Sequence, residues 1–371
     1  MKIRSFFWGG LFCLIPLFSC AHEDEYLEDF VLEIEQKNDT IISNDSTRTN
    51  ETTSPNDSVN SKDTISSPSQ SQYHKESMDT IVHGYNVTDT LICSYEKYMS
   101  IPSSAIYGTG QGGACYDKYF FQGYSNNAAI GIFDLEKKEC LGKVDITEPT
   151  PNSKIHANTI NFGTQRYNDN DFFPLLYVNS GYTQKVGKDV CSFIYVYRIL
   201  RDVDFDGAEV FSAILVQTIT MKGFETWTEG ILDNDNNMLW VKYIPNGAEG
   251  PFRYASFDLP KYDKANVDIL QKDYLVDFPL EPRSFTSSSQ GHLFYKDRIL
   301  LVGGTAPSVQ KLTFIVINTI TRIREHVVDL EKLGLRDEPE NLFFYKDQLM
   351  IGYRRSLYIF NVKVVSKDSI N

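Results

Sequence analysis

The stretch Gln290-Gly-His-Leu-Phe-Tyr-Lys-Asp-Arg-Ile-Leu-Leu-Val-Gly-Gly304 decides the fold, because two other parts of the chain share its layout. Small polar residues lead into an apolar pair, a Tyr/Lys/Asp turn, an apolar strand and a glycine. The related stretches are Gln111-Gly-Gly-Ala-Cys-Tyr-Asp-Lys-Tyr-Phe-Phe-Gln-Gly-Tyr124 and Glu340-Asn-Leu-Phe-Phe-Tyr-Lys-Asp-Gln-Leu-Met-Ile-Gly-Tyr353. Self-similarity at a spacing of about 40–60 residues is typical of propeller blades or solenoid turns. The sequence therefore predicts a repeat architecture.

The surrounding residues 85–366 have the pattern of an all-β domain. Aromatic and β-branched runs recur about every ten residues, and Gly, Asn, Asp and Lys turns separate them. Residues 330–333, just before Gly334, form at most a short helical turn. We predict an all-β fold, a β-propeller of five four-stranded blades, although six or seven blades also fit the strand pattern.

The five expected blades open at Gln111, His156, Thr228, Gln290 and Glu340. In the third blade the outermost strand is expected at residues 265–270. The fifth blade lacks a fourth strand, because the chain ends soon after residue 364. A propeller closes by pairing strands from the two ends of the chain, which removes an exposed edge. Residues 88–95, at the start of the domain, are the predicted closing strand.

The N-terminus has the layout of a secretory signal peptide. Lys2 and Arg4 precede an apolar run over residues 6–18, which is too short to cross a bilayer as a helix. The run ends in Leu17-Phe18-Ser19-Cys20, which resembles the lipobox of bacterial lipoproteins. This resemblance implies a signal peptide at residues 1–19 and a lipid on Cys20, which would hold the protein at the membrane.

The acidic cluster His22-Glu-Asp-Glu25 resembles a surface-export signal of Bacteroides-group lipoproteins, and a solvated acidic linker is the alternative interpretation. Residues 20–84 form the predicted tether, because their Ser/Thr/Asn-rich composition cannot bury enough apolar surface to fold. The propeller then occupies residues 85–371. We expect an outer-membrane lipoprotein, monomeric, with exposure on the cell surface left open. The formal net charge of −13 argues against nucleic acid as a partner.

Polar residues begin each predicted inner strand, so five blades would bring them together at the mouth of the central channel. There they could bind a polar ligand, or bond to one another and to channel water. Trp227 comes just before an inner strand and could stack on a sugar or a peptide. The candidate ligand-binding residues are Gln111, His156, Asn158, Trp227, Glu229, Gln290, His292, Glu340 and Asn341.

No cofactor and no metal site is predicted, because no short ligand spacing such as HExxH or CxxC is present. His156 and His292, with Glu229 or Glu340, leave a zinc site or an acid/base pair open as a minority interpretation. Asp233-Asn-Asp-Asn-Asn237 resembles a fragment of a calcium loop, yet the Gly and Glu of an EF-hand are missing. A plain turn between strands is favoured for this stretch.

Two families share short motifs with the chain. The Gln-Gly openings, His156-Ala-Asn-Thr-Ile-Asn-Phe-Gly163 and Phe173-Pro-Leu-Leu-Tyr177 resemble uncharacterised propeller lipoproteins of Bacteroides-type bacteria, over most of residues 103–365. Thr228-Glu-Gly-Ile231 and Ser289-Gln-Gly-His292 are more distantly similar to the blade openings of propeller-type glutamine cyclotransferases. The catalytic residues of that family do not map onto this chain, so no catalytic residue is assigned.

The sequence is compatible with three functions. The favoured hypothesis is that the channel mouth binds a glycan, a peptide or a protein partner without turning it over. The alternative is a hydrolase or cyclotransferase that acts on a glycan or peptide through channel carboxylates or His. A scaffold with a water-filled channel is the third. Whether the protein is an enzyme is left undecided.

Overall fold

The computed structural model describes residues 90–105, 107–125, 128–146, 155–181, 183–186, 189–224, 228–245, 252–280, 289–305 and 310–365. The predicted signal peptide, Cys20, the whole tether and Trp227 lie outside these ranges. Within them, no helix has the length and hydropathy that a membrane crossing needs.

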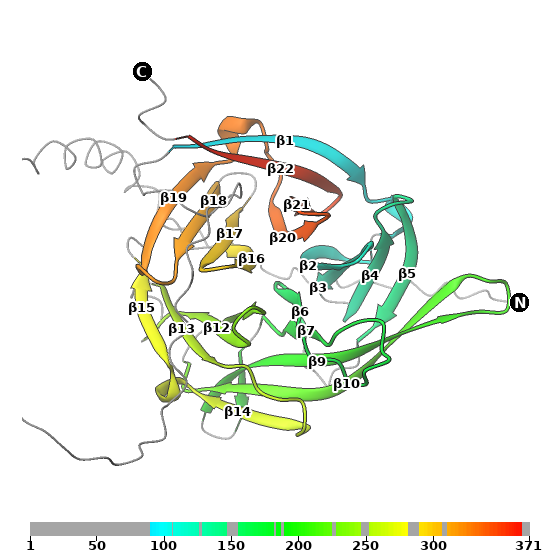
Figure 1. Ribbon diagram of the computed structural model, residues 1–371, viewed down its shortest axis with the longest axis horizontal. Helices are drawn as coiled ribbons and strands as arrows, with labels where there is room; N and C mark the ends of the chain where they lie inside the picture. The colour runs from blue at the N-terminus through cyan, green and yellow to red at the C-terminus, as the bar shows by residue number, and fades with distance from the viewer. Residues whose placement is uncertain are drawn as a thin grey trace, which may run out of the picture. The chain divides into compact units, whose positions relative to one another are not determined.

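Five sheets surround a central axis, as the sequence predicts (Figure 1). From the axis outward, the first blade contains β2 (Thr109–Tyr116), β3 (Tyr119–Ser125), β4 (Ala129–Asp134) and β5 (Glu139–Asp145). The second contains β6 (Ile160–Phe162), β7 (Leu176–Asn179), β9 (Asp189–Val203) and β10 (Glu209–Lys222), and β8 (Gln184–Val186) also pairs with β9. The third contains β11 (Glu229–Asp233), β12 (Met238–Tyr243), β13 (Phe252–Asp258) and β15 (Val276–Leu280).

The fourth blade contains β16 (Ser289–Tyr295), β17 (Arg298–Thr305), β18 (Gln310–Asn318) and β19 (Ile323–Asp329). The fifth contains β20 (Pro339–Tyr345), β21 (Gln348–Tyr353), β22 (Ser356–Val365) and β1 (Thr90–Ser100). The remaining elements are short 3-10 turns, η1 (Ser103–Ala105), η3 (Gln271–Asp273) and η5 (Glu331–Leu333). η5 confirms the predicted helical turn, which ends at Gly334 with φ 91°.

The N-terminal strand closes the ring. β1 pairs antiparallel with β22, and Tyr95 lies opposite Phe360 in the register. The predicted closing strand is therefore confirmed from Thr90, and it extends to Ser100; residues 88 and 89 lie outside the described ranges. The first and last strands of the described chain cover one another's edges in this arrangement.

One strand assignment is wrong. Residues 265–270 were expected as the outermost strand of the third blade, and β15 takes that place instead, paired with β13. β14 (Asn266–Leu270) leaves the third blade and pairs parallel with β10 of the second blade, with Thr218 opposite Asn266. Strand character alone cannot say which neighbour a strand will join, because that choice depends on which sheet edge lies within reach.

Apolar side chains from neighbouring blades pack against one another to form the core. The rings of Phe120 in the first blade and Phe343 in the fifth stack with centroids 4.6 Å apart, and Trp240 and Phe294 stack between the third and fourth blades. Because both faces of a sheet are covered in this way, β3 and β4 are buried at every residue. This explains why their sequences are mostly apolar and lack the regular polar alternation of a half-exposed strand, although Gln122, Ser125 and Asp134 are also buried.

Candidate functional site

Three inner strands carry a β-bulge at the same place, just after they begin. In β16, Ser289 lies opposite Gly303 and Gly291 opposite Val302, so Gln290 is the extra residue. Glu340 is the extra residue of β20 in the same way, and the register of β2 shifts across Gln111 and Gly112. A bulge turns a side chain away from the regular alternation of a strand. Gln111, Gln290 and Glu340 are thus structural equivalents, as the repeat alignment predicts.

The glycines of the Gln-Gly openings are required by close packing at the axis. A Cβ on Gly291 would lie 2.6 Å from the Cα of Asn341, and one on Gly112 would lie 2.7 Å from the carbonyl carbon of Asn158. The Gly112 amide also donates to the carbonyl of Ala157 at 3.0 Å. Each glycine therefore lets one inner strand approach the backbone of the next blade.

Glu229 is the centre of one buried polar group, which we call the Glu229 cluster; it consists of Glu229, Asn158, Asn179, Lys242 and His292. The Asn158 amide donates to Glu229 Oε1 at 2.9 Å, and Lys242 Nζ lies 3.5 Å from Glu229 Oε2. His292 Nδ1 lies 3.2 Å from Glu229 Oε2. Asn179 donates to the carbonyl of Thr228 and to Asn158 Oδ1. All five residues are buried.

Burial controls the protonation of this cluster. It lowers the pKa of His292 to about 4, and the charge of Glu229 only partly opposes this shift. Burial also lowers the pKa of Lys242, again against the attraction of Glu229. At neutral pH, His292 is therefore a neutral imidazole, and its Nε2 has no hydrogen-bond partner among the described residues. A neutral imidazole can donate or accept a hydrogen bond.

A second group lies where β16, β20 and the turn between β21 and β22 meet, and we call it the Glu340 cluster; it consists of Gln290, Glu338, Glu340 and Arg354. The Gln290 amide donates to Glu338 Oε1 at 2.5 Å. Arg354 donates to Glu340 Oε1 at 3.1 Å and also pairs with Glu338. Both carboxylates are buried, whereas the Arg354 side chain is 45% exposed.

Two carboxyl groups in one buried cluster do not ionise normally. Burial raises the pKa of Glu340 to about 8, the charge of Glu338 adds to the shift, and Arg354 opposes it. Burial also raises the pKa of Glu338. Glu340 therefore keeps its proton at neutral pH, which is the state that a general acid or a hydrogen-bond donor needs.

Asn341 joins the Glu340 cluster to the first blade. Its amide nitrogen donates to the main-chain carbonyl of Gln111 at 3.0 Å. The side chain packs against Gly352, where an added Cβ would come within 2.0 Å of Asn341 Oδ1. The oxygens Gln111 Oε1, Glu340 Oε2 and Asn341 Oδ1 are buried with no hydrogen-bond partner in the described part of the chain.

The fold thus brings together most of the predicted site residues. Asn158, Glu229 and His292 meet in one cluster, and Gln290 and Glu340 meet in the other. Gln111 and Asn341 link to the second cluster through the bond just described. His156 is half-buried, and its pKa is lowered by burial against the charge of Glu229. Trp227 lies outside the described residues.

Four cluster members escaped the sequence analysis, namely Asn179, Lys242, Glu338 and Arg354. Lys242 could have been found from the sequence. If the two strands that contain Glu229 and Lys242 form a hairpin around the predicted turn at residues 233–237, the two residues lie opposite each other, as they do in the structure. Arg354 could not be found in this way, because no other blade has a matching residue at its position. The turn between β21 and β22 places it beside Glu340.

The metal interpretations gain no support from the geometry. Among the residues that the structure describes, no three His, Cys, Asp or Glu side chains gather as metal ligands would. Asp233 instead forms the turn between β11 and β12, where its carboxylate accepts from the main-chain and side-chain nitrogens of Asn236. The turn predicted for residues 233–237 is therefore confirmed.

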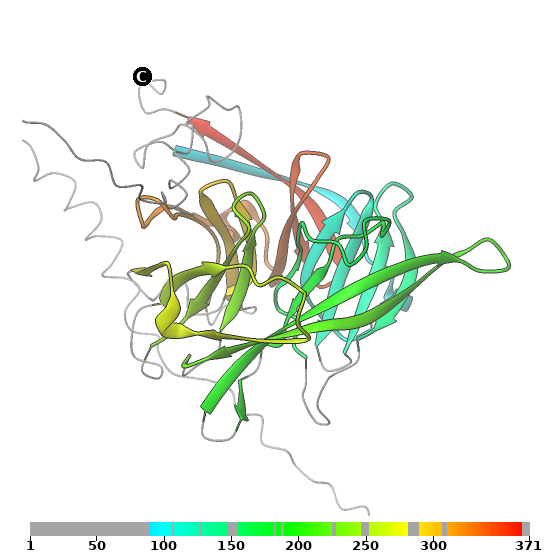
Figure 2. The ribbon, with the colours of Figure 1, turned by 60° about the horizontal axis from the view of Figure 1, so that its bottom comes forward.

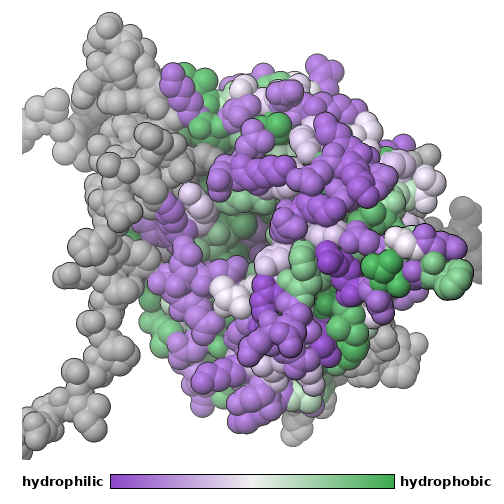
Figure 3. Space-filling model, turned by 45° about the vertical axis from the view of Figure 1, so that its right-hand side comes forward, coloured by the Kyte–Doolittle hydropathy of each residue, from purple (hydrophilic) through white to green (hydrophobic). Residues whose placement is uncertain are grey.

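Some residues in or beside the two clusters are partly exposed to solvent. Gln290 and His156 are half-buried, and Arg354 reaches solvent. The space-filling view shows a hollow near the middle of the face that it draws, between mainly hydrophilic surfaces (Figure 3). Two cavities on the described surface lie elsewhere, one of about 480 Å³ lined by residues 260–268 and one of about 100 Å³ between Tyr95 and Tyr358.

No protein-family model and no curated protein matches this chain. Solved structures with a similar fold include the PQQ-bound aldose sugar dehydrogenase of Streptomyces coelicolor, with 8% identity, a TM-score of 0.42, and 74% of this chain and 99% of that chain covered. The glutaminyl cyclase of Myxococcus xanthus has 9% identity, a TM-score of 0.41 and coverage of 74% and 98%. A luciferin-regenerating enzyme has 8% identity, a TM-score of 0.41 and coverage of 75% and 97%. These distant likenesses concern the fold alone and assign no activity.

Proposed function

We propose that this protein is a membrane-anchored propeller lipoprotein that binds a small polar ligand, without turnover, where β2, β16 and β20 begin. The observation that carries the proposal is the set of buried oxygens without partners, Gln111 Oε1, Asn341 Oδ1 and Glu340 Oε2. Leaving a buried polar atom unpaired costs about 1–3 kcal/mol. A ligand that reaches these buried oxygens, once the half-buried Gln290 side chain moves aside, would supply the missing partners and recover that free energy on binding.

The chemistry of these atoms indicates the class of ligand. The amide oxygens of Gln111 and Asn341 accept hydrogen bonds, so the ligand must present O–H or N–H donors. The protonated carboxyl of Glu340 can donate to a ligand oxygen. Sugar hydroxyls and peptide amides offer both kinds of group.

Calorimetric titration of the full chain with defined oligosaccharides and peptides tests the proposal. The variant Gln290→Ala should weaken capture about tenfold or more, because Gln290 lies at the half-buried rim of the site. The matched control Gln348→Ala changes the same residue type at the exposed far end of β21 and should leave affinity unchanged. Equal affinity in both variants would contradict the location of the site.

A second candidate function rests on the raised pKa of Glu340. A carboxylic acid that is protonated at neutral pH, beside a second carboxyl, can serve as a general acid in hydrolysis or cyclisation. Incubation of the full chain with fluorogenic glycosides and peptides would detect turnover. Loss of turnover in Glu340→Gln, with ligand affinity retained, would favour this enzyme over the binding protein.

Membrane anchoring is tested separately. The lipid that the lipobox implies should be found on Cys20 by mass spectrometry of the membrane fraction, and Cys20→Ser should release the protein from that fraction. A Cys20→Ser protein that stays in the membrane fraction would contradict the anchor and leave the ligand site untouched.

A further inference from the structure

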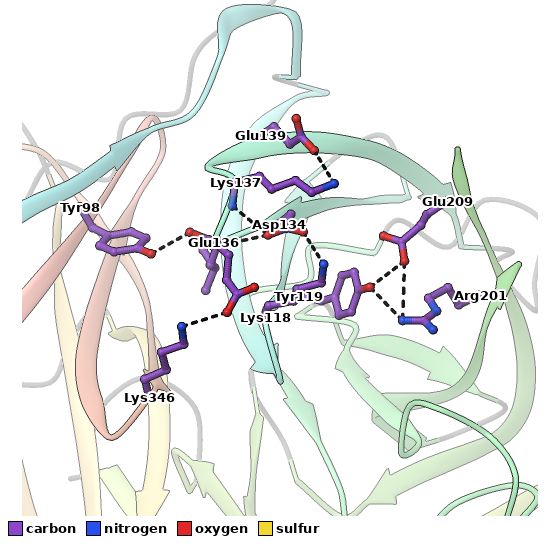
Figure 4. A network of polar contacts seen from close by, with 11 residues as sticks. Tyr98, Lys118, Tyr119, Asp134, Glu136, Lys137, Glu139, Arg201, Glu209 and Lys346 are labelled. Carbon is purple, nitrogen blue, oxygen red and sulfur yellow. Dashed lines mark hydrogen bonds and ion pairs between the residues drawn. The ribbon is translucent and has the colours of Figure 1, made fainter. Parts of the chain in front are cut away.

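The hairpin of β9 and β10 extends beyond the ring as an arm, and it is plain in both ribbon views (Figures 1 and 2). The arm is built as a rigid element. Close to the tip turn, where the arm passes the first blade, Tyr119 donates to Glu209 Oε1 at 2.7 Å, and Arg201 donates to the Tyr119 hydroxyl at 2.9 Å (Figure 4). At its tip Asp204 Oδ1 accepts from the amides of Asp206 and Ala208.

Part of one edge of the hairpin is not paired with another described strand. β10 pairs with β9 along its whole length, from Glu209 to Lys222. On its other side, β14 pairs only with residues 218–222. Within the described chain, residues 209–216 therefore keep an unpaired edge. Such edges are open to pairing with another strand unless charge, proline or a covering segment protects them.

The exposed residues of this edge form a symmetric pattern. Val210 is 42% exposed and Ile214 is 45% exposed, with the exposed Ser212 midway between them. If two copies of β10 pair antiparallel with Ser212 opposite itself, Val210 of each copy lies opposite Ile214 of the other. Cross-strand pairs of β-branched residues stabilise antiparallel sheets. The edge is thus complementary to itself in this single register.

The same register brings the tip of each arm to a defined surface of the other copy. In the dimer, the tip of one arm reaches the level of residues 216–220 of the other copy, where the 260–265 loop and the first residues of β14, which pair with residues 218–220, already lie along the edge. Gln217 holds that loop by donating to the carbonyls of Lys261 and Lys264. The cavity of about 480 Å³ on this loop is lined by Pro260, Lys261, Asp263, Lys264, Asn266, Val267 and Asp268.

The tip is aromatic and acidic, and the cavity presents two lysines beside two aspartates, of which Asp268 already pairs with Lys222. Phe205 is fully exposed at the tip, and it is surrounded in sequence by Asp202, Asp204 and Asp206. A preorganised turn that presents an aromatic side chain is a common form of interface anchor. Phe205 would enter the cavity, and Lys261 and Lys264 would attract the carboxylates of the tip against the repulsion of Asp263.

We propose that two copies of this chain form a two-fold symmetric dimer by antiparallel pairing of residues 209–215 of β10, with Phe205 of each arm docked on the 260–268 surface of the other copy. This inference is independent of the ligand site at the axis, and it replaces the expectation of a monomer.

Sedimentation of the full chain carrying Cys20→Ser, which cannot be lipidated, tests the dimer. The expected mass is twice 42.4 kDa at about 100 μM, and Ile214→Lys should raise the dissociation constant at least tenfold. The matched control Ile92→Lys alters another exposed isoleucine on an outermost strand, β1, and should leave the mass at that of a dimer. A monomer at this concentration, or a dimer that both variants weaken equally, overturns the proposal.

Two further variants test the register. The double variant Val210→Glu/Ile214→Lys places opposite charges across the two-fold axis and should restore the dimer that Ile214→Lys loses. Ser212→Cys should form a disulfide between copies under mild oxidation, because residue 212 lies opposite itself. A dimer that gains no such crosslink and no charge rescue would show that another surface is the interface.

Discussion

Lys242 lies directly opposite Glu229 in the antiparallel pair of β12 and β11, and both charged groups are buried, with Nζ 3.5 Å from Oε2. In a buried ion pair, the attraction between the charges offsets the cost of their desolvation only while both partners are present. The pair is therefore a point where single and double substitutions should differ.

We expect Glu229→Leu to destabilise the protein by about 3–5 kcal/mol, because it leaves the ammonium of Lys242 buried without its partner. The double variant Glu229→Leu/Lys242→Met should recover at least half of that loss. Urea denaturation measures both values. A double variant as unstable as the single one would contradict the account.

Glu340 should make the protein less stable as the pH rises from about 4.5 to about 8. Its folded-state pKa of about 8 lies above the ordinary value of 4.5 because of burial and the charge of Glu338. Between these two values the folded state holds a proton that the unfolded state has lost, so the slope is negative, at most about 1.4 kcal/mol per pH unit. In Glu340→Gln the slope over this range should become smaller, and an unchanged slope would argue against the raised pKa.

His292 should act in the opposite direction at lower pH. Burial brings its pKa down from 6.5 to about 4, so between these values the unfolded state binds a proton that the folded state does not. Stability should then fall as the pH drops from about 6.5 to about 4. Urea denaturation of His292→Gln should show a weaker loss over this window, while the slope above pH 6.5 should match that of the wild type.

Gly291→Ala should be strongly destabilising, because the added Cβ would meet the Asn341 backbone at 2.6 Å and backbone cannot move aside cheaply. Gly207→Asn is a suitable control: nothing lies within 4 Å of a Cβ there, and asparagine tolerates the positive φ of 84°. Thermal unfolding should show a melting temperature lower by several degrees in the first variant and a small change in the second. Similar losses in both would mean that the inner strands can separate.

Removal of residues 1–100 should prevent stable folding, whereas removal of residues 1–84 should be tolerated. The longer deletion takes away β1 and exposes the edge of β22, which pairs with β1 from Thr90 to Ser100. Circular dichroism and solubility of the two truncated proteins distinguish these outcomes. A folded, soluble protein that begins at residue 101 would show that closure by β1 is dispensable.

Much of the fold was predictable from the sequence because each blade repeats the same local pattern. The shared layout after Gln111, Gln290 and Glu340 defines an inner strand, a Tyr/Lys/Asp turn and a second strand, and these choices depend on residues close together in the chain. The parallel pairing of β14 with β10 was not predictable, since it depends on an edge that the long arm offers about 45 residues earlier in the sequence.

The candidate site divides in the same way. The sequence by itself determined which polar residues stand at the beginnings of the inner strands, because the repeat aligns them. Only the tertiary structure decided their partners: the bulges at Gln290 and Glu340 are a matter of strand register, and the raised pKa of Glu340 needs Glu338 and burial from several blades. The local pattern of strands and turns depends on residues that are neighbours in the sequence. Desolvation and charge pairing, which set the pKa values, depend on distances between residues that come together only when the ring closes.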